Sequence, residues 1–150
     1  MAARIRRAGV AVALTLLLAT ALAGAAYAAT LVGTAGPDEL RGTPNSDEIS
    51  GLGGDDFIVG RGADDDLSGG RGDDFIEGRS GPDYIVGGRG VDEHYSQGGN
   101  DRIEAADGKR DFVNCGSGEY DRASVDADED VQDVVKNCEI VNGQPVVAPE

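Results

Sequence analysis

The sequence lacks most of the residues from which a conventional globular core is built. Tryptophan is absent, and the 150 residues include only three phenylalanines, four tyrosines and one methionine. Because a small domain must bury large apolar side chains to be stable, this scarcity argues against a single large core. An architecture in which each short unit buries a little against its neighbours needs far fewer such residues.

Positive charge is scarce as well. Thirteen Lys and Arg stand against 28 Asp and Glu, which gives a formal net charge of −15. We therefore expect no nucleic-acid partner, because binding to phosphates requires a basic surface. Self-repulsion of this size disfavours a compact chain, and multivalent cations are the natural counter-charge.

Long apolar runs are missing except near the N-terminus. A basic start is followed by an apolar run from Ala8 to Ala23, and Ala26-Tyr27-Ala28 has the small-x-small pattern of a cleavage site. This order predicts a secretory signal peptide over residues 1–28. A membrane anchor is the alternative, but the run is shorter than the ~20 apolar residues that a spanning helix needs. We expect a secreted, extracellular protein with no membrane span in the mature chain.

Cysteine and histidine are rare. Cys115 and Cys138 are the two cysteines, and in an exported chain such a pair predicts a disulfide. A zinc site is the alternative, but two cysteines without nearby histidines cannot fill four positions. His94 is the single histidine, and no nucleophile is placed beside it in the pattern. We interpret it as a core imidazole or part of a distorted turn, and we expect no enzymatic activity.

The sequence is rich in one feature, a nine-residue period. Residues 33–113 divide into nine consecutive nonapeptides, and glycine opens the first seven of them. The eighth position is usually Leu or Ile, and the sixth position is Asp in every unit except the last, which has Arg110. The aspartates at the sixth position are Asp38, Asp47, Asp56, Asp65, Asp74, Asp83, Asp92 and Asp101. A fixed period of this kind indicates a repeat architecture.

Each nonapeptide combines a turn and a strand. Its first six positions are rich in Gly, Asp and Pro, which favour a turn, and its last three alternate exposed, buried and exposed, as in a short β-strand. Two nonapeptides then make one flattened coil. Residues 29–113 are predicted to form an all-β, parallel β-roll (a β-solenoid) of nine nonapeptide units, about four and a half coils and roughly 20 Å long. Residues 114–150 fall outside the period and are predicted to form a short C-terminal cap closed by the disulfide.

The turns offer the ligands that calcium prefers. Ca²⁺ takes six to eight oxygens, from carboxylates and backbone carbonyls, and stacking brings together turns that are two nonapeptides apart in the sequence. This arrangement predicts up to six full calcium sites. The paired aspartates are Asp38/Asp56, Asp56/Asp74, Asp74/Asp92, Asp47/Asp65, Asp65/Asp83 and Asp83/Asp101. Solvated turn residues are the alternative, and we assign that role to the adjacent Asp55, Asp64 and Asp73.

One unit, Gly69-Gly70-Arg71-Gly72-Asp73-Asp74-Phe75-Ile76-Glu77, resembles the nonapeptide of repeats-in-toxin (RTX) calcium-binding β-rolls at every defined position. The likeness covers residues 33–104, and the tail is similar to that of small secreted calcium-binding repeat proteins of actinobacterial type. The resemblance implies that the sixth-position aspartates and the turn carbonyls hold Ca²⁺. The glycines at the fourth position of these turns are Gly36, Gly54, Gly72, Gly81, Gly90 and Gly99. Asn45 and Ala63 depart from the pattern there.

Calcium does not explain an apolar stripe on the outside of the strands. Phe57, Phe75 and Tyr95 fall at outward positions of odd-numbered units, which places them on one sheet, and Tyr84 is an exception in an even-numbered unit. An outer apolar stripe usually indicates a covered surface. Our hypothesis is that the disulfide-closed tail folds over it, or caps the open last coil, through four valines, and a partner surface is the alternative. The valines are Val125, Val131, Val134 and Val135.

The sequence therefore predicts a secreted calcium-binding repeat protein whose folding is coupled to Ca²⁺. A cell-envelope adhesion or carbohydrate-binding module is the competing function, because it would use the aromatic stripe. No cell-surface protein or glycan can be named as a partner from the sequence.

Overall fold

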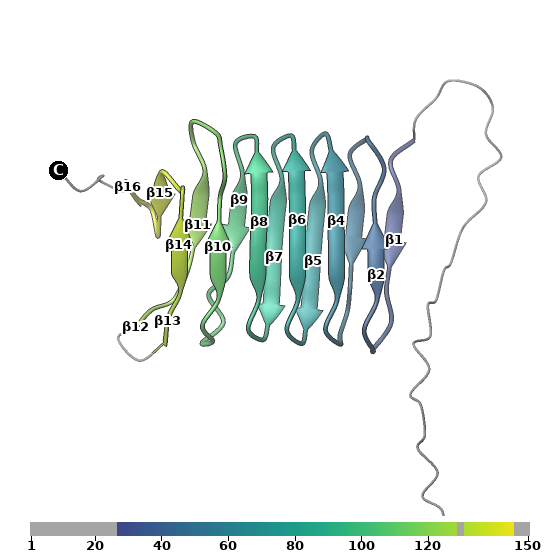
Figure 1. The fold of residues 1–150 in the computed structure, drawn as a ribbon, viewed down its shortest axis with the longest axis horizontal. Coiled ribbons are helices and arrows are strands. Elements are labelled where there is room, and N and C mark those ends of the chain that lie inside the picture. Colours follow the sequence, from purple (N-terminus) through teal and green to yellow (C-terminus); the bar gives the residue numbers. More distant parts are fainter. Residues whose placement is uncertain (1–26, 129–130, 146–150) are drawn as a thin grey trace, which may run out of the picture.

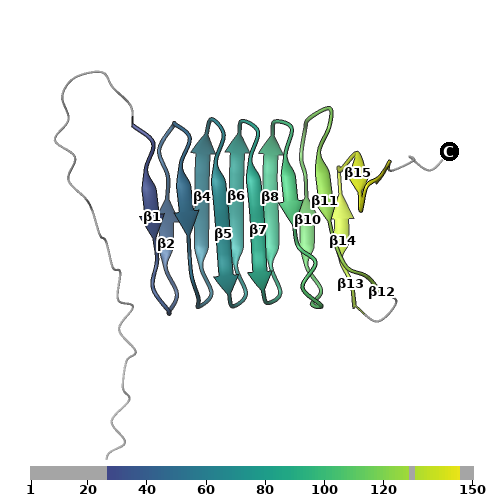
Figure 2. The ribbon, with the colours of Figure 1, turned by 180° about the vertical axis from the view of Figure 1, so that it is seen from behind.

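The computed structural model describes residues 27–128 and 131–145, which form a parallel β-solenoid of two facing sheets (Figures 1 and 2). The first sheet has the order β1 (Thr30–Val32), β3 (Glu48–Ser50), β5 (Asp66–Arg71), β7 (Tyr84–Arg89), β9 (Arg102–Glu104), β11 (Arg122–Ser124), β15 (Ile140–Val141) and β16 (Gln144–Pro145). The second sheet has the order β2 (Glu39–Arg41), β4 (Phe57–Gly62), β6 (Phe75–Ser80), β8 (Glu93–Gly98), β10 (Phe112–Asn114) and β14 (Val134–Lys136). A separate antiparallel pair joins β12 (Ala127–Asp128) to β13 (Val131–Gln132).

The chain alternates between the two sheets, and each coil lies directly on the one before it. In the second sheet Phe57 pairs with Phe75, and in the first Asp66 pairs with Tyr84, both in parallel and both between residues two nonapeptides apart. This register confirms the parallel β-roll predicted from the nine-residue period. Among the described residues every regular element is a strand, and none forms a helix that could cross a membrane. The predicted signal peptide lies almost wholly outside the described residues.

The central strands are longer than predicted. Strands β4 to β8 each contain six residues instead of three, and the turns between them are correspondingly short. The strand continues because the glycine that opens each unit also faces inward. Gly69 and Gly87 are buried as fully as the isoleucine or leucine two residues before them. The opening glycine is thus an interior residue of the roll and not only part of a turn.

The stack is also longer than predicted, because it does not stop at residue 113. Strand β11 pairs in parallel with β9, β14 with β10, and β15 with β11. The solenoid therefore has about six turns, and the count of nine units is not confirmed. The period obscured these coils because their connections contain additional residues.

The described part of the tail lies in the stack and not over the aromatic stripe. Val125 is buried in the core and Val135 packs against it, while Val134 belongs to β14. Of the two arrangements expected for these valines, covering the stripe is wrong, whereas stacking on the last coil agrees with the structure. The side chain of Val131 lies outside the described residues. The predicted disulfide between Cys115 and Cys138 is confirmed, and both cysteines belong to the buried core.

Two columns of inward side chains form that core. The first sheet contributes Ile49, Leu67, Ile85 and Ile103, and the second contributes Leu40, Ile58, Ile76, His94 and Val113. Each coil adds one residue to each column, so the core grows by small increments along the axis. This geometry explains how a chain with so few aromatic residues can fold.

Truncating one residue of a column should destabilise the roll measurably. We expect Ile76→Ala to lower the free energy of unfolding by about 3 kcal/mol, because it leaves a cavity between two fully buried neighbours. Val91→Ala removes a half-exposed side chain and should cost about 0.5 kcal/mol or less. Urea unfolding of the calcium-saturated protein measures both. Equal effects of the two substitutions would contradict the proposed core.

Candidate metal-binding turns

The sixth-position aspartates form two rows, one at each edge of the roll. Each aspartate immediately precedes a strand, so its position along the axis is fixed by the parallel ladder. Asp38, Asp56, Asp74 and Asp92 lie in the turns that enter the second sheet, and Asp47, Asp65, Asp83 and Asp101 lie in the turns that enter the first. All of them except Asp38 are buried.

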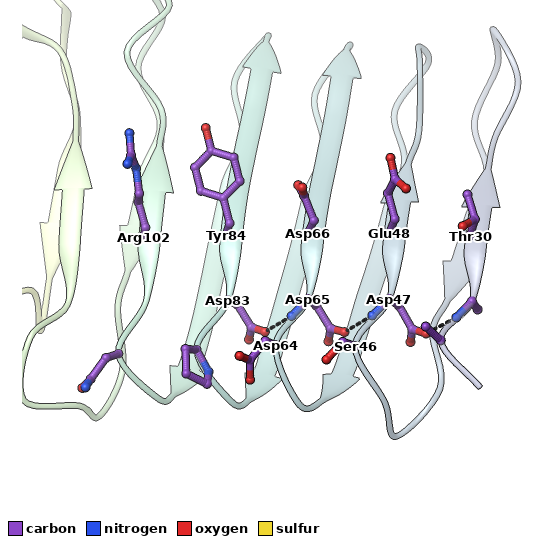
Figure 3. Close-up of a pocket in the computed structure, with 14 residues that line it drawn as sticks. Thr30, Ser46, Asp47, Glu48, Asp64, Asp65, Asp66, Asp83, Tyr84 and Arg102 are labelled. Atoms are coloured by element: carbon purple, nitrogen blue, oxygen red, sulfur yellow. Dashed lines mark hydrogen bonds between the residues drawn. The ribbon is translucent and has the colours of Figure 1, made fainter. Parts of the chain in front are cut away.

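A hydrogen-bond ladder connects the aspartates within each row. The backbone N–H of Asp56 donates to Oδ1 of Asp74 at 2.8 Å, and the backbone N–H of Asp74 donates to Oδ1 of Asp92 at 2.9 Å. Figure 3 shows the same pattern along Asp47, Asp65 and Asp83 in the other row. The predicted pairs are thus adjacent in the fold, and one oxygen of each carboxylate is used to hold neighbouring coils together.

The second oxygen of most of these carboxylates has no partner. Oδ2 is buried and accepts no hydrogen bond in Asp56, Asp65, Asp74, Asp83, Asp92 and Asp101. Asp38 and Asp47, in the first coil, differ because the backbone N–H groups of Thr34 and Thr43 donate to their Oδ2 atoms. An unpaired buried carboxylate oxygen is costly, so a row of them requires protons or cations.

The opening glycines provide the space that these oxygens occupy. A Cβ atom on Gly69 would lie 2.3 Å from Oδ2 of Asp74 and 2.6 Å from the carbonyl oxygen of Gly87. Gly51 has the same surroundings, with Asp56 and Gly69. Carboxylate and carbonyl oxygens both accept hydrogen bonds and cannot satisfy each other. Their proximity fits the oxygen-rich environment that calcium requires.

The turn glycines bring further carbonyl oxygens to these edges. A Cβ atom on Gly72 would lie only 2.3 Å from the carbonyl oxygen of Gly54, and one on Gly90 would lie 1.9 Å from that of Gly72. Gly81 and Gly99 stack in the same way at the other edge, whereas Gly36 has open space beside it. Glycine is needed at Gly72, Gly81, Gly90 and Gly99 because φ is positive, +119° at Gly72 for example, and because a side chain would overlap the neighbouring coil.

No ion could be held here by side chains alone. Among the described residues, no group of three or more His, Cys, Asp or Glu side chains is arranged to hold a metal ion. Each coil instead contributes one carboxylate and several backbone carbonyls to an edge. An ion between two coils would therefore take a large share of its ligands from the backbone, as calcium sites commonly do.

The aspartate rows extend beyond Arg110, which the nine-residue period did not predict. The backbone N–H of Asp92 donates to Oδ1 of Asp111, that of Asp101 to Asp121, and that of Asp111 to Asp133. These steps span 19, 20 and 22 residues because the intervening turns contain insertions. The signal that could have found them is the short motif of an aspartate followed by a strand, as in Asp111-Phe112-Val113, and not the fixed period.

Burial makes these carboxylates difficult to ionise. Desolvation, with a smaller contribution from neighbouring aspartates, raises the pKa of Asp74 and Asp83 from an ordinary value of 3.8 to about 7. Burial also raises the pKa of Asp65 and Asp92 to about 6. The ladder hydrogen bonds oppose this effect but do not cancel it. The rows therefore hold protons at mildly acid pH unless another cation replaces them.

The aspartates that precede the rows lie on the outside, as predicted. Asp55, Asp64 and Asp73 are exposed. Asp55 nevertheless accepts a hydrogen bond from the backbone N–H of Asp73, and Asp73 accepts one from Val91, each across one full coil. These outer carboxylates help to connect neighbouring coils, in addition to contacting solvent.

Three of the four aromatic residues of the predicted partner surface lie on one sheet, and Tyr84 is the exception, as the sequence predicts. Phe57, Phe75 and Tyr95 lie on the second sheet, where they and Phe112 stack with ring centroids 5.2–5.4 Å apart. Tyr84 lies on the first sheet, beside Arg102 (Figure 3). Phe57 and Phe75 are nearly parallel, so their ring faces are turned toward each other. A sugar ring stacks on an exposed aromatic face. In this aromatic ladder of Phe57, Phe75, Tyr95 and Phe112 the ring faces are largely covered by one another.

Filling the space beside an unpartnered carboxylate oxygen should destabilise the fold. We expect Gly69→Ala to cost roughly 1–3 kcal/mol, because its Cβ would overlap Oδ2 of Asp74 and force the turn to shift. Gly53→Ala is the matched control, since Gly53 is also buried but its Cβ would meet its nearest atom at 3.5 Å. Thermal unfolding with saturating calcium compares the two. A control as destabilised as Gly69→Ala would contradict the role of the opening glycine.

Without metal, the protein should be more stable at acid than at neutral pH. The raised pKa values mean that the folded chain keeps protons that the unfolded chain has already lost, so stability falls as pH rises from about 4 to 7. Urea unfolding in the presence of a chelator, between pH 4 and pH 7, measures this slope. A free energy of unfolding that increases over that interval would show that the carboxylates are already satisfied within the protein.

Comparison with known proteins agrees with this geometry. The family model described as RTX calcium-binding nonapeptide repeat (4 copies) matches residues 24–58, 32–67, 41–76, 59–93 and 77–109, together more than half of the chain. No curated protein and no solved structure matches the chain. The matched segments carry the paired aspartates and the turn glycines, and the last of them ends in the turn between β9 and β10, where the spacing of the aspartates first departs from 18 residues. On this evidence the chain belongs to the family of RTX calcium-binding nonapeptide repeat proteins.

Proposed function

We propose that this protein is secreted and that its folding is coupled to the binding of calcium between neighbouring coils. The observation that carries the proposal is the row of buried Oδ2 atoms without partners at each edge of the roll. Six array aspartates share this feature, and each is adjacent to the aspartate one coil away. Divalent ions would neutralise these carboxylates and so stabilise the folded chain over the unfolded one.

Each site would use two aspartates from neighbouring coils and the carbonyl oxygens of the turns between them. The six pairs formed by Asp38, Asp56, Asp74 and Asp92 at one edge and Asp47, Asp65, Asp83 and Asp101 at the other are the proposed sites. The carbonyls of the fourth-position glycines are further candidate ligands. Oδ2 of Asp111 and of Asp121 is also buried without a partner. Beyond Asp101, however, the opening glycine is replaced by Ala105, Cys115 and Val125, which occupy the interior space with apolar atoms. We therefore assign no full calcium site to Asp111, Asp121 or Asp133.

Secretion and calcium dependence support one another in this proposal. The N-terminal segment has the order of a secretory signal peptide. Extracellular calcium modules bind Ca²⁺ with dissociation constants of about 10⁻⁴–10⁻³ M. Sites of that strength would be empty inside a cell and filled outside it. The chain would then remain unfolded until export and fold where calcium is abundant.

We assign the protein no catalytic activity and no carbohydrate-binding role. His94 is fully buried, so a substrate could not reach its imidazole. The aromatic ladder is closed at both ends, because the Arg41 guanidinium lies over Phe57 and the Lys136 ammonium lies over Phe112. Ring stacking and these cation–π contacts stabilise the outer surface of the second sheet. Calcium binding is the activity for which the interior of the roll is arranged.

Circular dichroism of the full chain, with and without calcium, tests the proposal. We expect β-structure with millimolar Ca²⁺ and its loss in chelator at pH 7. The variant Asp74→Asn sharpens the test, because it keeps an Oδ1 acceptor for Asp56 but removes the charge. It should lower the unfolding temperature of the calcium-bound protein and raise stability in chelator. Asp66→Asn removes one charge from an exposed position and should do neither.

Two outcomes would overturn the proposal. One is a β-roll that persists unchanged in chelator at neutral pH, since the buried carboxylates would then need no metal. The other is an Asp74→Asn protein that binds calcium with the stoichiometry and affinity of the wild type, since Asp74 would then not be a ligand.

A further inference from the structure

His94 occupies a position that is otherwise aliphatic. Its β-strand neighbours in the inward column are Ile76 on one side and Val113 on the other. The imidazole is completely buried, with 0% of its surface exposed. Placing a polar ring in a dry core is unfavourable unless its nitrogen atoms are satisfied.

One ring nitrogen has a partner, and that partner fixes the tautomer. Nδ1 lies 3.3 Å from the carbonyl oxygen of Phe112. Because a carbonyl only accepts hydrogen bonds, the neutral ring must carry its proton on Nδ1 and donate it to Phe112. Nε2 is then left with a bare lone pair. Nε2 is buried and has no hydrogen-bond partner.

Nε2 of His94 lies near a carboxylate oxygen, Oδ2 of Asp92, that is also buried without a hydrogen-bond partner. A Cβ atom on Gly87 would lie 2.5 Å from Nε2 of His94 and 2.5 Å from Oδ2 of Asp92. The distance between Nε2 of His94 and Oδ2 of Asp92 therefore cannot exceed the sum of these two distances. Both atoms border the space that Gly87 leaves open. Both are buried and unpartnered. Two lone pairs cannot satisfy one another, so a cation between them would resolve the conflict.

The chemistry of this pair differs from that of the other coils. At the equivalent place, Asp74 and Asp56 are accompanied by Ile76 and Ile58, so only oxygen atoms are available. Calcium prefers oxygen ligands, whereas imidazole nitrogen suits Zn²⁺ and similar borderline ions. A metal-binding histidine usually donates its other ring N–H to a backbone carbonyl or carboxylate. The hydrogen bond from His94 to Phe112 meets that requirement.

We propose that Nε2 of His94 and Oδ2 of Asp92 form a site for a borderline divalent transition-metal ion, of which Zn²⁺ is the probe, in the coil opened by Gly87. Backbone carbonyls or water would supply the remaining ligands. The site is enclosed, so the ion would enter as the coils assemble. Asp92 also belongs to the proposed calcium pair Asp74/Asp92, so a transition-metal ion here would replace calcium at that pair and leave the other five pairs unchanged. The inference gives the single histidine of the chain a role in the fold.

The experiment uses the full chain without a histidine tag, with its disulfide intact, so that His94 is the only imidazole and neither cysteine is a free thiolate. The protein is unfolded in chelator, transferred to buffer with one equivalent of Zn²⁺, and folded by adding excess calcium. Nitrogen-15 NMR then follows the imidazole, and metal analysis after desalting gives the stoichiometry. We expect one retained Zn²⁺ per chain and a displaced Nε2 resonance.

The variant His94→Ile reproduces the aliphatic residue of the preceding coils and should retain calcium-dependent folding but no zinc. Asp66→Asn, which removes an exposed carboxylate on the outer surface, should retain one Zn²⁺. If His94→Ile does not fold, the wild-type NMR experiment decides the question alone. The proposal is overturned if the Nε2 resonance is unchanged by zinc, or if His94→Ile retains as much zinc as the wild type. Neither result would affect the calcium proposal, which is read from the calcium-dependent circular dichroism.

Discussion

Buried negative charge is the constraint on which the architecture depends. Each coil places an aspartate at the start of each of its two strands, and in most of them one oxygen is bonded to the neighbouring coil while the other lies inside the turn without a partner. Stacking identical coils therefore stacks like charges, which repel each other. Full ionisation of these carboxylates at neutral pH is therefore unfavourable within the roll's own contacts. The hydrogen-bond ladder defines the geometry, and under the proposed function calcium ions supply the missing compensation.

The interior changes along the axis in a way that fits this constraint. From Gly33 to Gly87 the opening position is always glycine, and the space beside it is available to oxygen atoms and ions. In later coils the position is taken by Ser96, Ala105, Cys115 and Val125, all of them buried. The disulfide between Cys115 and Cys138 lies within this later part. The N-terminal coils thus leave space beside their carboxylates, while the C-terminal coils place larger side chains and a covalent link there, although Oδ2 of Asp111 and of Asp121 is also buried without a partner.

The sequence was a good guide wherever the period was exact. It predicted the two-unit coil, the inward column of Ile and Leu, the adjacency of aspartates two nonapeptides apart, and the disulfide. It failed where the strands and aspartates still stack in register but the number of residues between them is no longer 18. Asp111 continues the row although Arg110 holds the expected place, because one inserted residue is absorbed by an exposed turn.

Features that depend on side-chain direction were also missed. The opening glycine resembles a turn residue in sequence, yet it faces inward and extends the strand. The conflict between His94 and Asp92 becomes visible only when the carbonyl of Phe112 fixes the imidazole tautomer.

A crystal structure of the calcium-bound protein, with the ions located by anomalous scattering, tests the central claim most directly. The account predicts calcium at both edges of the roll, between consecutive aspartates such as Asp56 and Asp74, with Oδ2 atoms and turn carbonyls as ligands. Edges that hold no calcium in crystals grown at millimolar Ca²⁺, with the Oδ2 atoms still unpartnered, would contradict it.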